Sequence, residues 1–124
     1  MVPPRVLFID DEQDIRTVAE ISLADVAGWS VSLAGSGAQG LSLAVASPPD
    51  VILLDVMMPG LDGPATMAAL GEHAGTRHVP VIFITAKLQN AEIERLMSIG
   101  AIGVIHKPFD PIELPGEIER LLGS

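Results

Sequence analysis

Residues 50–63 read DVILLDVMMPGLDG and bring a charged side chain into the most apolar part of the chain. The four apolar residues 51–54 are typical of a strand that is buried on both faces. They lead directly into Asp55, whose negative charge is costly in apolar surroundings unless a partner offsets it. The position of this carboxylate therefore requires a chemical explanation.

Length and composition limit the possible functions. The chain of 124 residues is long enough for one domain, residues 1–124, with a substantial core. Its sixteen Asp and Glu against seven Lys and Arg argue against direct binding to nucleic acid, whose phosphates attract basic residues. No apolar run reaches the roughly 20 residues of a membrane span, and we expect no membrane partner. Cysteine is absent, so no disulfide is expected, and the cytoplasm is the expected compartment.

Four other apolar runs resemble the one that precedes Asp55, and most are continuous rather than alternating. Continuous runs are typical of parallel strands that helices cover on both faces. The expected strands are residues 6–10, 29–34, 51–55, 80–85 and 101–106.

Helical patterns lie between these runs, with apolar or small residues three or four positions apart. The segment SGAQ, residues 36–39, predicts a capping box at the start of the second helix. Gly100 predicts a helix end, and Pro115 predicts either a kink in the last helix or a start near that residue. The expected core-facing positions are Ile15, Val18, Ala19, Ser22 and Val26 in the first helix, Ile93, Leu96 and Met97 before Gly100, and Ile118, Leu121 and Leu122 in the last helix.

This alternation of strands and helices predicts an α/β fold with an open parallel sheet and right-handed crossovers. Ligands of such sheets bind at the carboxyl ends of the strands. Three carboxylates, one hydroxyl and one ammonium group are therefore expected on a single rim. The residues at the expected strand ends are Asp10, Asp11, Asp55, Thr85, Ala86, Lys107 and Pro108.

Taken singly, most of these residues also have ordinary structural explanations. Asp10 and Asp11 can cap the helix that follows them. Thr85 can be a β-branched strand residue, and Lys107 can be a surface ammonium. Asp55 is the hardest to explain in this way, and the coincidence of all of them at strand ends favours a shared site.

The charges of such a site suggest its chemistry. Two carboxylates ~4 Å apart repel each other by about 4 kcal/mol at an effective dielectric constant of about 20. Lys107 offsets only part of the repulsion among three carboxylates, and a divalent cation such as Mg²⁺, which prefers oxygen ligands, would offset the rest. With Mg²⁺ bound, the pocket can accept a phosphoryl group, and a carboxylate can act as the nucleophile.

Four separated motifs carry a family resemblance that spans nearly the whole chain. FIDDE at residues 8–12, LLDVMMPGLDG at 53–63, ITA at 84–86 and HKPF at 106–109 resemble the receiver domain of two-component response regulators. This resemblance implies a doubly wound (βα)5 three-layer sandwich of the flavodoxin-like type. It also implies a parallel sheet with strand order 2-1-3-4-5.

The resemblance implies a role for each acidic residue of the rim. Asp55 corresponds to the phosphoacceptor, which attacks the phosphorus of a phosphohistidine on a sensor kinase. Asp11 corresponds to a direct Mg²⁺ ligand, and Asp10 to a residue that acts on the metal mostly through water. The backbone carbonyl of Met57 corresponds to the third protein ligand of the metal.

The remaining motif residues correspond to the switch of the family. Thr85 supplies the hydroxyl that bonds the phosphoryl group, and Ala86 completes its motif. Lys107 pairs with the phosphoryl group, and the bond to Pro108 is expected to be cis. Val104 replaces the aromatic residue that usually couples to the switch hydroxyl, so we expect activation to be communicated mainly through the fourth helix and the loop before it.

The resemblance further implies partners. A sensor histidine kinase or a phosphotransfer protein would supply the phosphoryl group, and an effector protein or a fused output domain would respond. A homodimer through the face formed by the fourth helix, fifth strand and fifth helix is possible. The chain is expected to catalyse only its own phosphorylation and slow dephosphorylation, and not to be an enzyme otherwise.

Other functions remain open at this stage. One alternative is a receiver-shaped interaction module that works without phosphorylation, but such modules typically lose one of the rim residues. A flavin or nucleotide binder should have a Gly-rich or Ser/Thr-rich phosphate loop after its first strand, where this chain has DDEQD. A phosphatase with an aspartyl nucleophile would carry that nucleophile after the first strand, in an acidic pair spaced by two, and would have a capping insertion. Neither feature is evident in this sequence. The sequence is compatible with both a stand-alone regulator and a piece of a longer protein.

Overall fold

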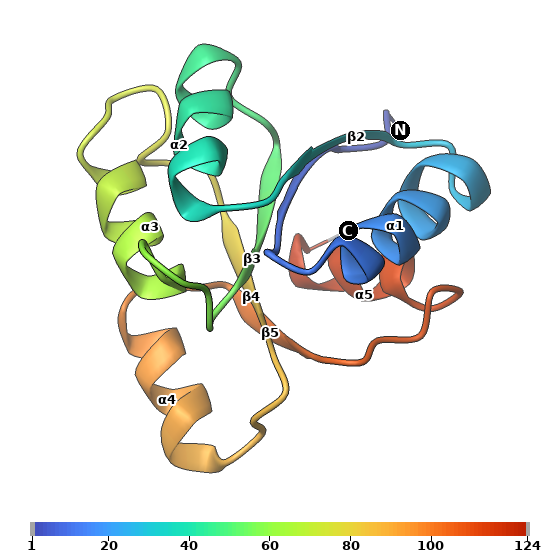
Figure 1. Ribbon diagram of the computed structural model, residues 1–124. Coiled ribbons are helices and arrows are strands. Elements are labelled where there is room, and N and C mark those ends of the chain that lie inside the picture. Colours follow the sequence, from blue (N-terminus) through green and yellow to red (C-terminus); the bar gives the residue numbers. More distant parts are fainter. Residues whose placement is uncertain (1, 124) are drawn as a thin grey trace.

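Five parallel strands form the centre of the computed structural model, which describes residues 2–123 (Figure 1). Their order in the sheet is 2-1-3-4-5, which confirms the expected topology. The strands are β1 (Arg5–Ile9), β2 (Ser30–Ala34), β3 (Val51–Asp55), β4 (Val81–Thr85) and β5 (Gly103–His106).

Helices cover both faces of this sheet and complete the three expected layers. Two of them, α1 and α5, lie on one face, and the other three lie on the opposite face (Figure 1). None of the helices within residues 2–123 is long and apolar enough to cross a membrane. The helices are α1 (Gln13–Glu20), continued by the π-helix η1 (Ile21–Val26), then α2 (Gly37–Ala46), α3 (Gly63–Gly71), α4 (Asn90–Ser98) and α5 (Leu114–Leu121).

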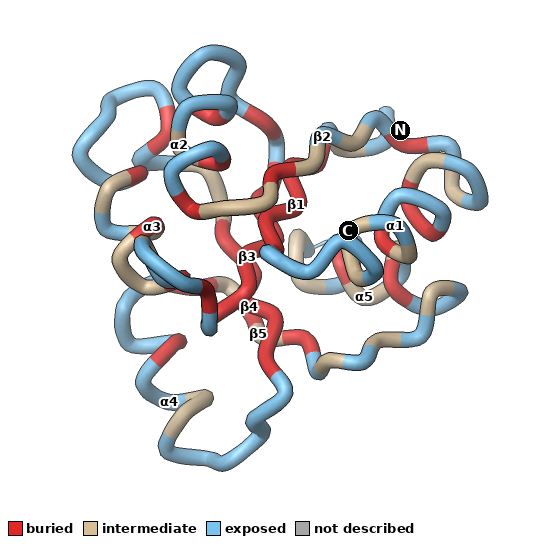
Figure 2. The backbone as a smooth tube through the Cα atoms, in the orientation of Figure 1, coloured by how far each residue is buried: buried red, intermediate tan, exposed pale blue. Residues whose placement is uncertain are grey.

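The central strands are buried on both faces, which explains why their sequences are continuously apolar. Every residue of β3 and β4 is buried, and Figure 2 shows the middle of the sheet as the buried centre of the molecule. Successive residues point to opposite faces, so Leu54 and Phe83 belong to one core cluster and Leu53 and Ile82 to the other. Asp55 ends β3 at the limit of this core.

The strand boundaries differ from the expected ones by one or two residues. Trp29, Pro80 and Ala101 precede β2, β4 and β5 rather than beginning them. Pro80 has no N–H to donate, although its carbonyl accepts a bond from Ile52 at 3.0 Å. At the other end, β1 stops at Ile9, so Asp10 lies just beyond the sheet.

The first helix departs from its expected period. Ala19 and Ser22 are buried as expected, but Val26 is 61% exposed and Leu23 occupies the core instead. The cause is the π-helix η1, whose wider turn rotates the residues after Glu20 away from the α-helical spacing. The hydroxyl of Ser22 donates to the carbonyl of Pro111, which lies in the segment between β5 and α5.

The expected helix ends are largely confirmed. Ser36 accepts a bond from the Gln39 amide at 3.1 Å, but the Gln39 side chain accepts from the Gly35 amide rather than from Ser36. Gly100 follows α4 with a positive φ of 110°, as expected for a helix end. The last helix begins at Leu114, so Pro115 lies in its first turn, where a missing N–H costs no helical bond.

The side-chain expectations for α4 and α5 are correct in part. Leu96 and Ile118 are fully buried. Met97 is largely exposed, so it does not belong to the stripe that was expected to face the core. Leu121 and Leu122 are half-buried and pack against the core as expected, although Leu122 lies just beyond the end of α5.

Close packing at Gly63 fixes the start of α3 against the end of β3. A Cβ atom at Gly63 would lie 2.6 Å from the carbonyl oxygen of Asp55 and 2.9 Å from the Cα of Val56. Both neighbours are backbone atoms that a side-chain rotation cannot move. A glycine is therefore required for α3 to approach the strand that carries Asp55.

We expect Gly63→Ala to lower the free energy of unfolding by about 2 kcal/mol or more, because the new methyl group overpacks the backbone of β3. Gly71→Ala is the matched control at the other end of α3, since nothing lies within 4 Å of its Cβ position. This control should raise the free energy of unfolding by about 0.5 kcal/mol through helix propensity. Urea titrations followed by circular dichroism measure both effects, and equal stability of the two variants would contradict the packing argument.

Candidate functional site

The carboxyl ends of four strands bring the expected polar residues together on one rim. Asp10 follows β1, Asp55 ends β3, Thr85 ends β4, and Lys107 follows β5. Asp10, Asp11 and Asp55 each place a carboxylate oxygen within 4.8 Å of those of the other two. The convergence that the strand ends predicted is therefore present.

The ammonium of Lys107 pairs with two of these carboxylates, those of Asp10 and Asp55. Its Nζ atom is 3.0 Å from Oδ2 of Asp10 and 3.5 Å from Oδ2 of Asp55. A third oxygen, Oε1 of Glu12, lies 3.0 Å from the same nitrogen. The peptide bond between Lys107 and Pro108 is cis, as expected.

Burial and mutual repulsion destabilise the charged form of two of the carboxyl groups. Burial, and next the negative charge of Asp10, raise the pKa of Asp55 from 3.8 to about 6, although Lys107 partly opposes this. Burial likewise raises the pKa of Asp10, against the lowering effect of bonds from the Glu12 amide and from Lys107. The ionised form of both carboxyl groups is therefore less favourable in the folded protein than in an exposed carboxylate.

The surroundings of Lys107 favour its charged form, unlike those of the two buried carboxyl groups. Burial by itself lowers the pKa of Lys107, but hydrogen bonds to Asp10 and Glu12 and the charge of Asp55 raise it well above its ordinary value. Its ammonium form is therefore maintained at any physiological pH.

Backbone contacts hold Asp10 in place and argue against a capping role for the acidic pair. Oδ1 of Asp10 accepts a bond from the Glu12 amide at 2.9 Å, and the carbonyl of Asp10 accepts one from the Arg16 guanidinium at 2.8 Å. The N-cap of α1 is Glu12, whose side chain makes no capping bond. Asp11 is exposed and points one carboxylate oxygen toward the cluster.

Thr85 lies buried at the end of β4 beside this cluster. Its Oγ1 accepts a hydrogen bond of 3.0 Å from the backbone amide of Lys87. Ala86, between these two residues, is exposed. The hydroxyl of Thr85 is therefore tied to the loop that leads into α4.

The remaining expected positions lie near the rim with different degrees of exposure. Val104 is half-buried on β5, where the family usually has an aromatic residue, and His106 is exposed. The side chain of Met57 is 65% exposed, so it contributes little to the core. Only its backbone carbonyl was expected to act, and that role stays a prediction.

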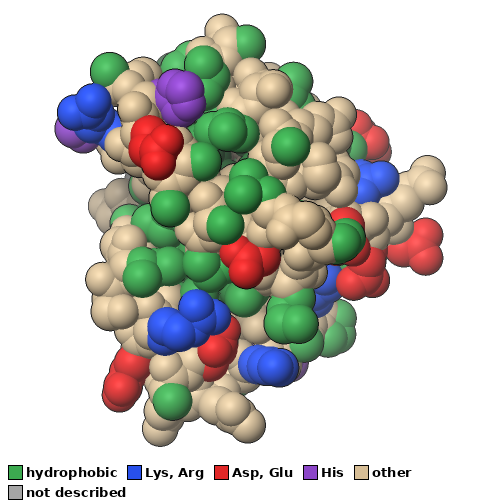
Figure 3. Space-filling view, turned by 60° about the vertical axis from the view of Figure 1, so that its left-hand side comes forward, with side chains coloured by type: hydrophobic (Ala, Val, Ile, Leu, Met, Phe, Trp, Pro, Cys, Tyr) green, Lys and Arg blue, Asp and Glu red, His purple; other side chains and the backbone are tan. Residues whose placement is uncertain are grey.

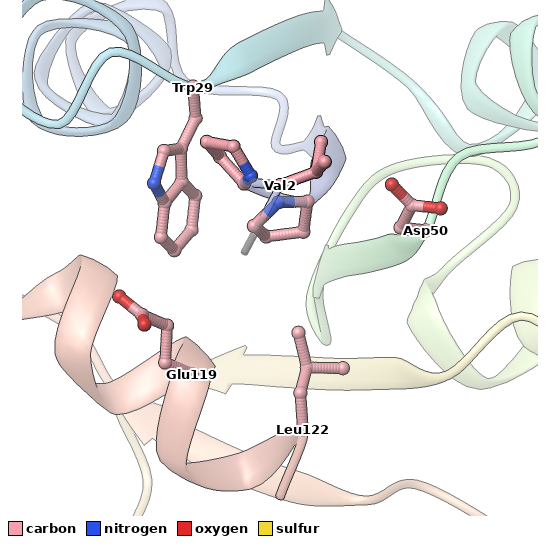
Figure 4. Close-up of a pocket in the computed structure, with 7 residues that line it drawn as sticks. Val2, Trp29, Asp50, Glu119 and Leu122 are labelled. Atoms are coloured by element: carbon pink, nitrogen blue, oxygen red, sulfur yellow. The ribbon is translucent and has the colours of Figure 1, made fainter. Parts of the chain in front are cut away.

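Two hollows elsewhere on the molecule lack the polar groups of the rim. One, of about 470 Å³, lies between α3 and α4 and is lined by apolar residues such as Met67, Val79 and Ile99. It belongs to the face in Figure 3, where hydrophobic side chains gather. The other, of about 570 Å³, lies at the opposite edge of the sheet between Trp29 and Leu122, with separated carboxylates at its sides (Figure 4).

The donor set of the rim fits a magnesium ion. Three carboxylates supply hard oxygen atoms close together, and burial, together with the negative charges of Asp10 and Asp11, raises the pKa of Asp55. A divalent cation offsets these charges, and Mg²⁺ is suited to one or two carboxylates with several waters. Asp10, Asp11 and Asp55 are the described residues that would hold it.

Sequence reasoning missed two residues of the site. Glu12 bonds the ammonium of Lys107, and Arg16 bonds the carbonyl of Asp10. Glu12 directly follows Asp10 and Asp11 in the sequence, and this adjacency could have predicted that Glu12 lies near the cluster. Arg16 lies one helical turn further along α1, and no local pattern distinguishes it from a surface arginine.

Comparison with known proteins identifies what this chain is similar to. The family model described as the response regulator receiver domain matches residues 6–119. The DNA-binding dual master transcriptional regulator RpaA of Synechocystis sp. is 36% identical over 119 residues, which are 96% of this chain and 49% of RpaA. Protein Rrf1 of Nitratidesulfovibrio vulgaris is 32% identical over 123 residues, with 99% of this chain and 86% of Rrf1 covered.

Solved structures show the same likeness in three dimensions. The chemotaxis protein CheY4 of Vibrio cholerae superposes with a TM-score of 0.88 at 30% identity, with 94% of this chain and 97% of CheY4 covered. The chain spans about half the length of RpaA and 26% of the length of the response regulator PleD of Caulobacter vibrioides. Relatives of this kind therefore carry further sequence beside the matched part.

We expect Asp55→Asn to raise the free energy of unfolding at pH 7 by about 2 kcal/mol in buffer with EDTA. The folded-state pKa of Asp55 lies above its unfolded value, so the native state is favoured below pH 4 and loses that advantage as the pH rises through about 6. The uncharged amide of the variant does not lose stability as the pH rises. The stabilisation of the variant relative to the wild type should therefore disappear at pH 4.

Urea titrations at both pH values measure this difference. Asp14→Asn removes an exposed carboxylate from the first turn of α1 and should change stability by less than about 0.5 kcal/mol at either pH. A destabilised Asp55→Asn protein at pH 7 would contradict the repulsion deduced for the rim.

Proposed function

Because the chain belongs to the family of response regulator receiver domains, we propose that it receives a phosphoryl group on Asp55 in a Mg²⁺-dependent reaction. The donor is a phosphohistidine on a sensor histidine kinase or a phosphotransfer protein. The convergence of Asp10, Asp11, Asp55 and Lys107 on one rim is the observation that supports this proposal.

In the transfer step, a carboxylate oxygen of Asp55 attacks the phosphorus. An oxygen–phosphorus bond forms as the bond between phosphorus and the imidazole nitrogen of the donor breaks, and the imidazole departs with the electron pair. Asp55 suits this role because it is ionised at neutral pH, with a pKa of about 6. Asp55 lies at the strand end and is 4% exposed, so a donor has to reach it through the rim.

Asp10, Asp11 and Asp55, together with the carbonyl of Met57, are the residues that would hold the metal. When bound, Mg²⁺ offsets the negative charges of the carboxylates and of the incoming phosphoryl oxygens. Lys107, which directly follows β5, contributes the other positive charge. Without these charges, three carboxylates would repel an anionic donor.

The new phosphoryl group carries about −1.5 to −2 charge and strong acceptor oxygens. Lys107 already faces Asp55 and pairs with one of these oxygens. The hydroxyl of Thr85 donates to another, which draws it away from the Lys87 amide. The new bond that Thr85 donates, which is possible only after phosphorylation, is the differential interaction that favours a second conformation.

The loop before α4 is the part of the molecule that moves when Thr85 bonds the phosphoryl group. An aromatic ring at position 104 could move together with Thr85, but Val104 has no such ring. The conformational change therefore passes through residues 86–89 into α4. An effector protein or a fused output domain then recognises the altered face. A homodimer through α4, β5 and α5 is one form that this recognition can take.

The protein acts in this proposal as a switch and not as an enzyme with turnover. It catalyses its own phosphorylation and a slow hydrolysis of the acyl phosphate. The transfer of the phosphoryl group takes place in the cytoplasm, where ATP-dependent kinases form phosphohistidine.

Incubation with Mg²⁺ and acetyl phosphate should add one phosphoryl group to the wild-type chain, detected by intact mass spectrometry. Asp55→Asn should show no adduct, and EDTA should abolish the adduct on the wild type. No adduct on the wild type with any small donor or phosphohistidine protein would favour the interaction module that works without phosphorylation. Release of many phosphates per chain would indicate an enzyme.

We expect Mg²⁺ and beryllofluoride, a mimic of the phosphoryl group, to change backbone amide shifts from Thr85 through α4 (Asn90–Ser98). The physical reason is the loss of the bond between Thr85 and the Lys87 amide. Thr85→Ala should keep the shift changes beside Asp55 and lose those in α4. Changes confined to the rim in the wild-type protein would contradict transmission through α4.

A further inference from the structure

From the contacts of Lys107 we infer that Glu12 is a positioning residue, which holds the ammonium before phosphorylation and is displaced when a phosphoryl oxygen arrives. The inference rests on the proposed function, because it describes how the same rim changes partners. Glu12 thereby competes with the phosphoryl group for one cation.

The first step of the argument is the number of donors on Lys107. A lysine ammonium has three N–H donors and no acceptor. Three carboxylate oxygens surround it, from Asp10 at 3.0 Å, Glu12 at 3.0 Å and Asp55 at 3.5 Å. Hydrogen bonds to Asp10 and Glu12 engage two of the donors, and the ammonium faces Asp55 at 3.5 Å without a hydrogen bond. A shift of the ammonium toward a phosphoryl group on Asp55 therefore has to stretch or break one of those two bonds.

The burial of each carboxylate around Lys107 determines which of them leaves the ammonium. The Asp10 side chain is fully buried, and its release would leave a carboxylate charge without a partner away from water, which is strongly unfavourable. Asp55 stays beside Lys107, since it carries the phosphoryl group. The side chain of Glu12 is 60% exposed, so water can solvate it as it leaves.

The backbone around Glu12 allows this movement without a change of fold. Its amide is bound to Oδ1 of Asp10 at 2.9 Å, and its carbonyl accepts the amide of Arg16 at 3.1 Å. Both bonds use only main-chain atoms of Glu12. The side chain can therefore rotate into solvent while the start of α1 remains in place.

The competition should be measurable as a modest change in affinity. Exposed ion pairs contribute roughly 0.2–1 kcal/mol, which corresponds to about a 1.5- to fivefold change in a binding constant. Glu12→Gln removes the competing charge with little change of shape. We therefore expect this variant to bind beryllofluoride, in the presence of Mg²⁺, about two- to fivefold more tightly than the wild type.

Calorimetric titration of the full chain with beryllofluoride at fixed Mg²⁺ measures this affinity. Asp14→Asn is the matched control, because it removes one exposed negative charge from the same helix without a contact to Lys107 among the described residues. This control should bind within about 1.5-fold of the wild type. Equal affinities of Glu12→Gln and Asp14→Asn would overturn the inference.

A spectroscopic measurement reports the displacement directly. The chain has two lysines, Lys87 and Lys107, so selective ¹⁵N labelling gives two side-chain signals. In the wild type without beryllofluoride, the Lys107 signal should differ from that of Glu12→Gln. With beryllofluoride, the two proteins should give the same Lys107 signal, and the carboxyl ¹³C signal of Glu12 should move to the position of a solvated glutamate.

The outcomes separate this inference from the proposed function. If beryllofluoride binds and shifts Lys107 while the Glu12 carboxyl signal stays constant, the displacement of Glu12 is overturned and the phosphoacceptor role stands. If beryllofluoride binds to none of the proteins, the proposed function fails and the inference fails with it.

Discussion

Repulsion among three neighbouring carboxylates, two of which pair with a single ammonium, is the constraint on which the rest of the structure depends. Asp10, Asp11 and Asp55 lie within 4.8 Å of one another, and Lys107 compensates only part of their charge. A flexible chain would separate such groups. Here the buried parallel sheet keeps them together, because each of Asp10, Asp55 and Lys107 is attached at or next to the end of a strand whose position the core fixes.

The fold therefore stores unfavourable electrostatic energy at one edge and stabilises it by burial elsewhere. The strands β3 and β4 are buried along their whole length, and α3 packs against the backbone of Asp55 through Gly63. These apolar contacts oppose the cost of the charged rim. They also hold the buried Asp10 and Asp55 close to each other, so the repulsion between these two carboxylates can be relieved by a cation or a change of partners.

Much of this arrangement was predictable from the sequence. Continuous apolar runs indicated the strands, and the strand ends indicated Asp55, Thr85 and Lys107, because these patterns follow from local geometry. The π-helix η1 was not predictable, since a periodic stripe gives no signal for one wider turn, and Val26 was misplaced for that reason. The contact of Glu12 with Lys107 joins residues 95 positions apart, and only the packing of β1 against its neighbours brings them together.

The bond between Ser22 and Pro111 has a consequence for how this chain can diverge or be engineered. It joins the wide turn after α1 to the segment that follows Lys107, two regions 89 residues apart in sequence. Ser22 is fully buried, so its hydroxyl has no access to water as a substitute acceptor. A chimera that exchanges η1 must therefore keep a hydroxyl donor at this position, and an insertion before α5 that moves the carbonyl of Pro111 would leave the buried hydroxyl without its acceptor.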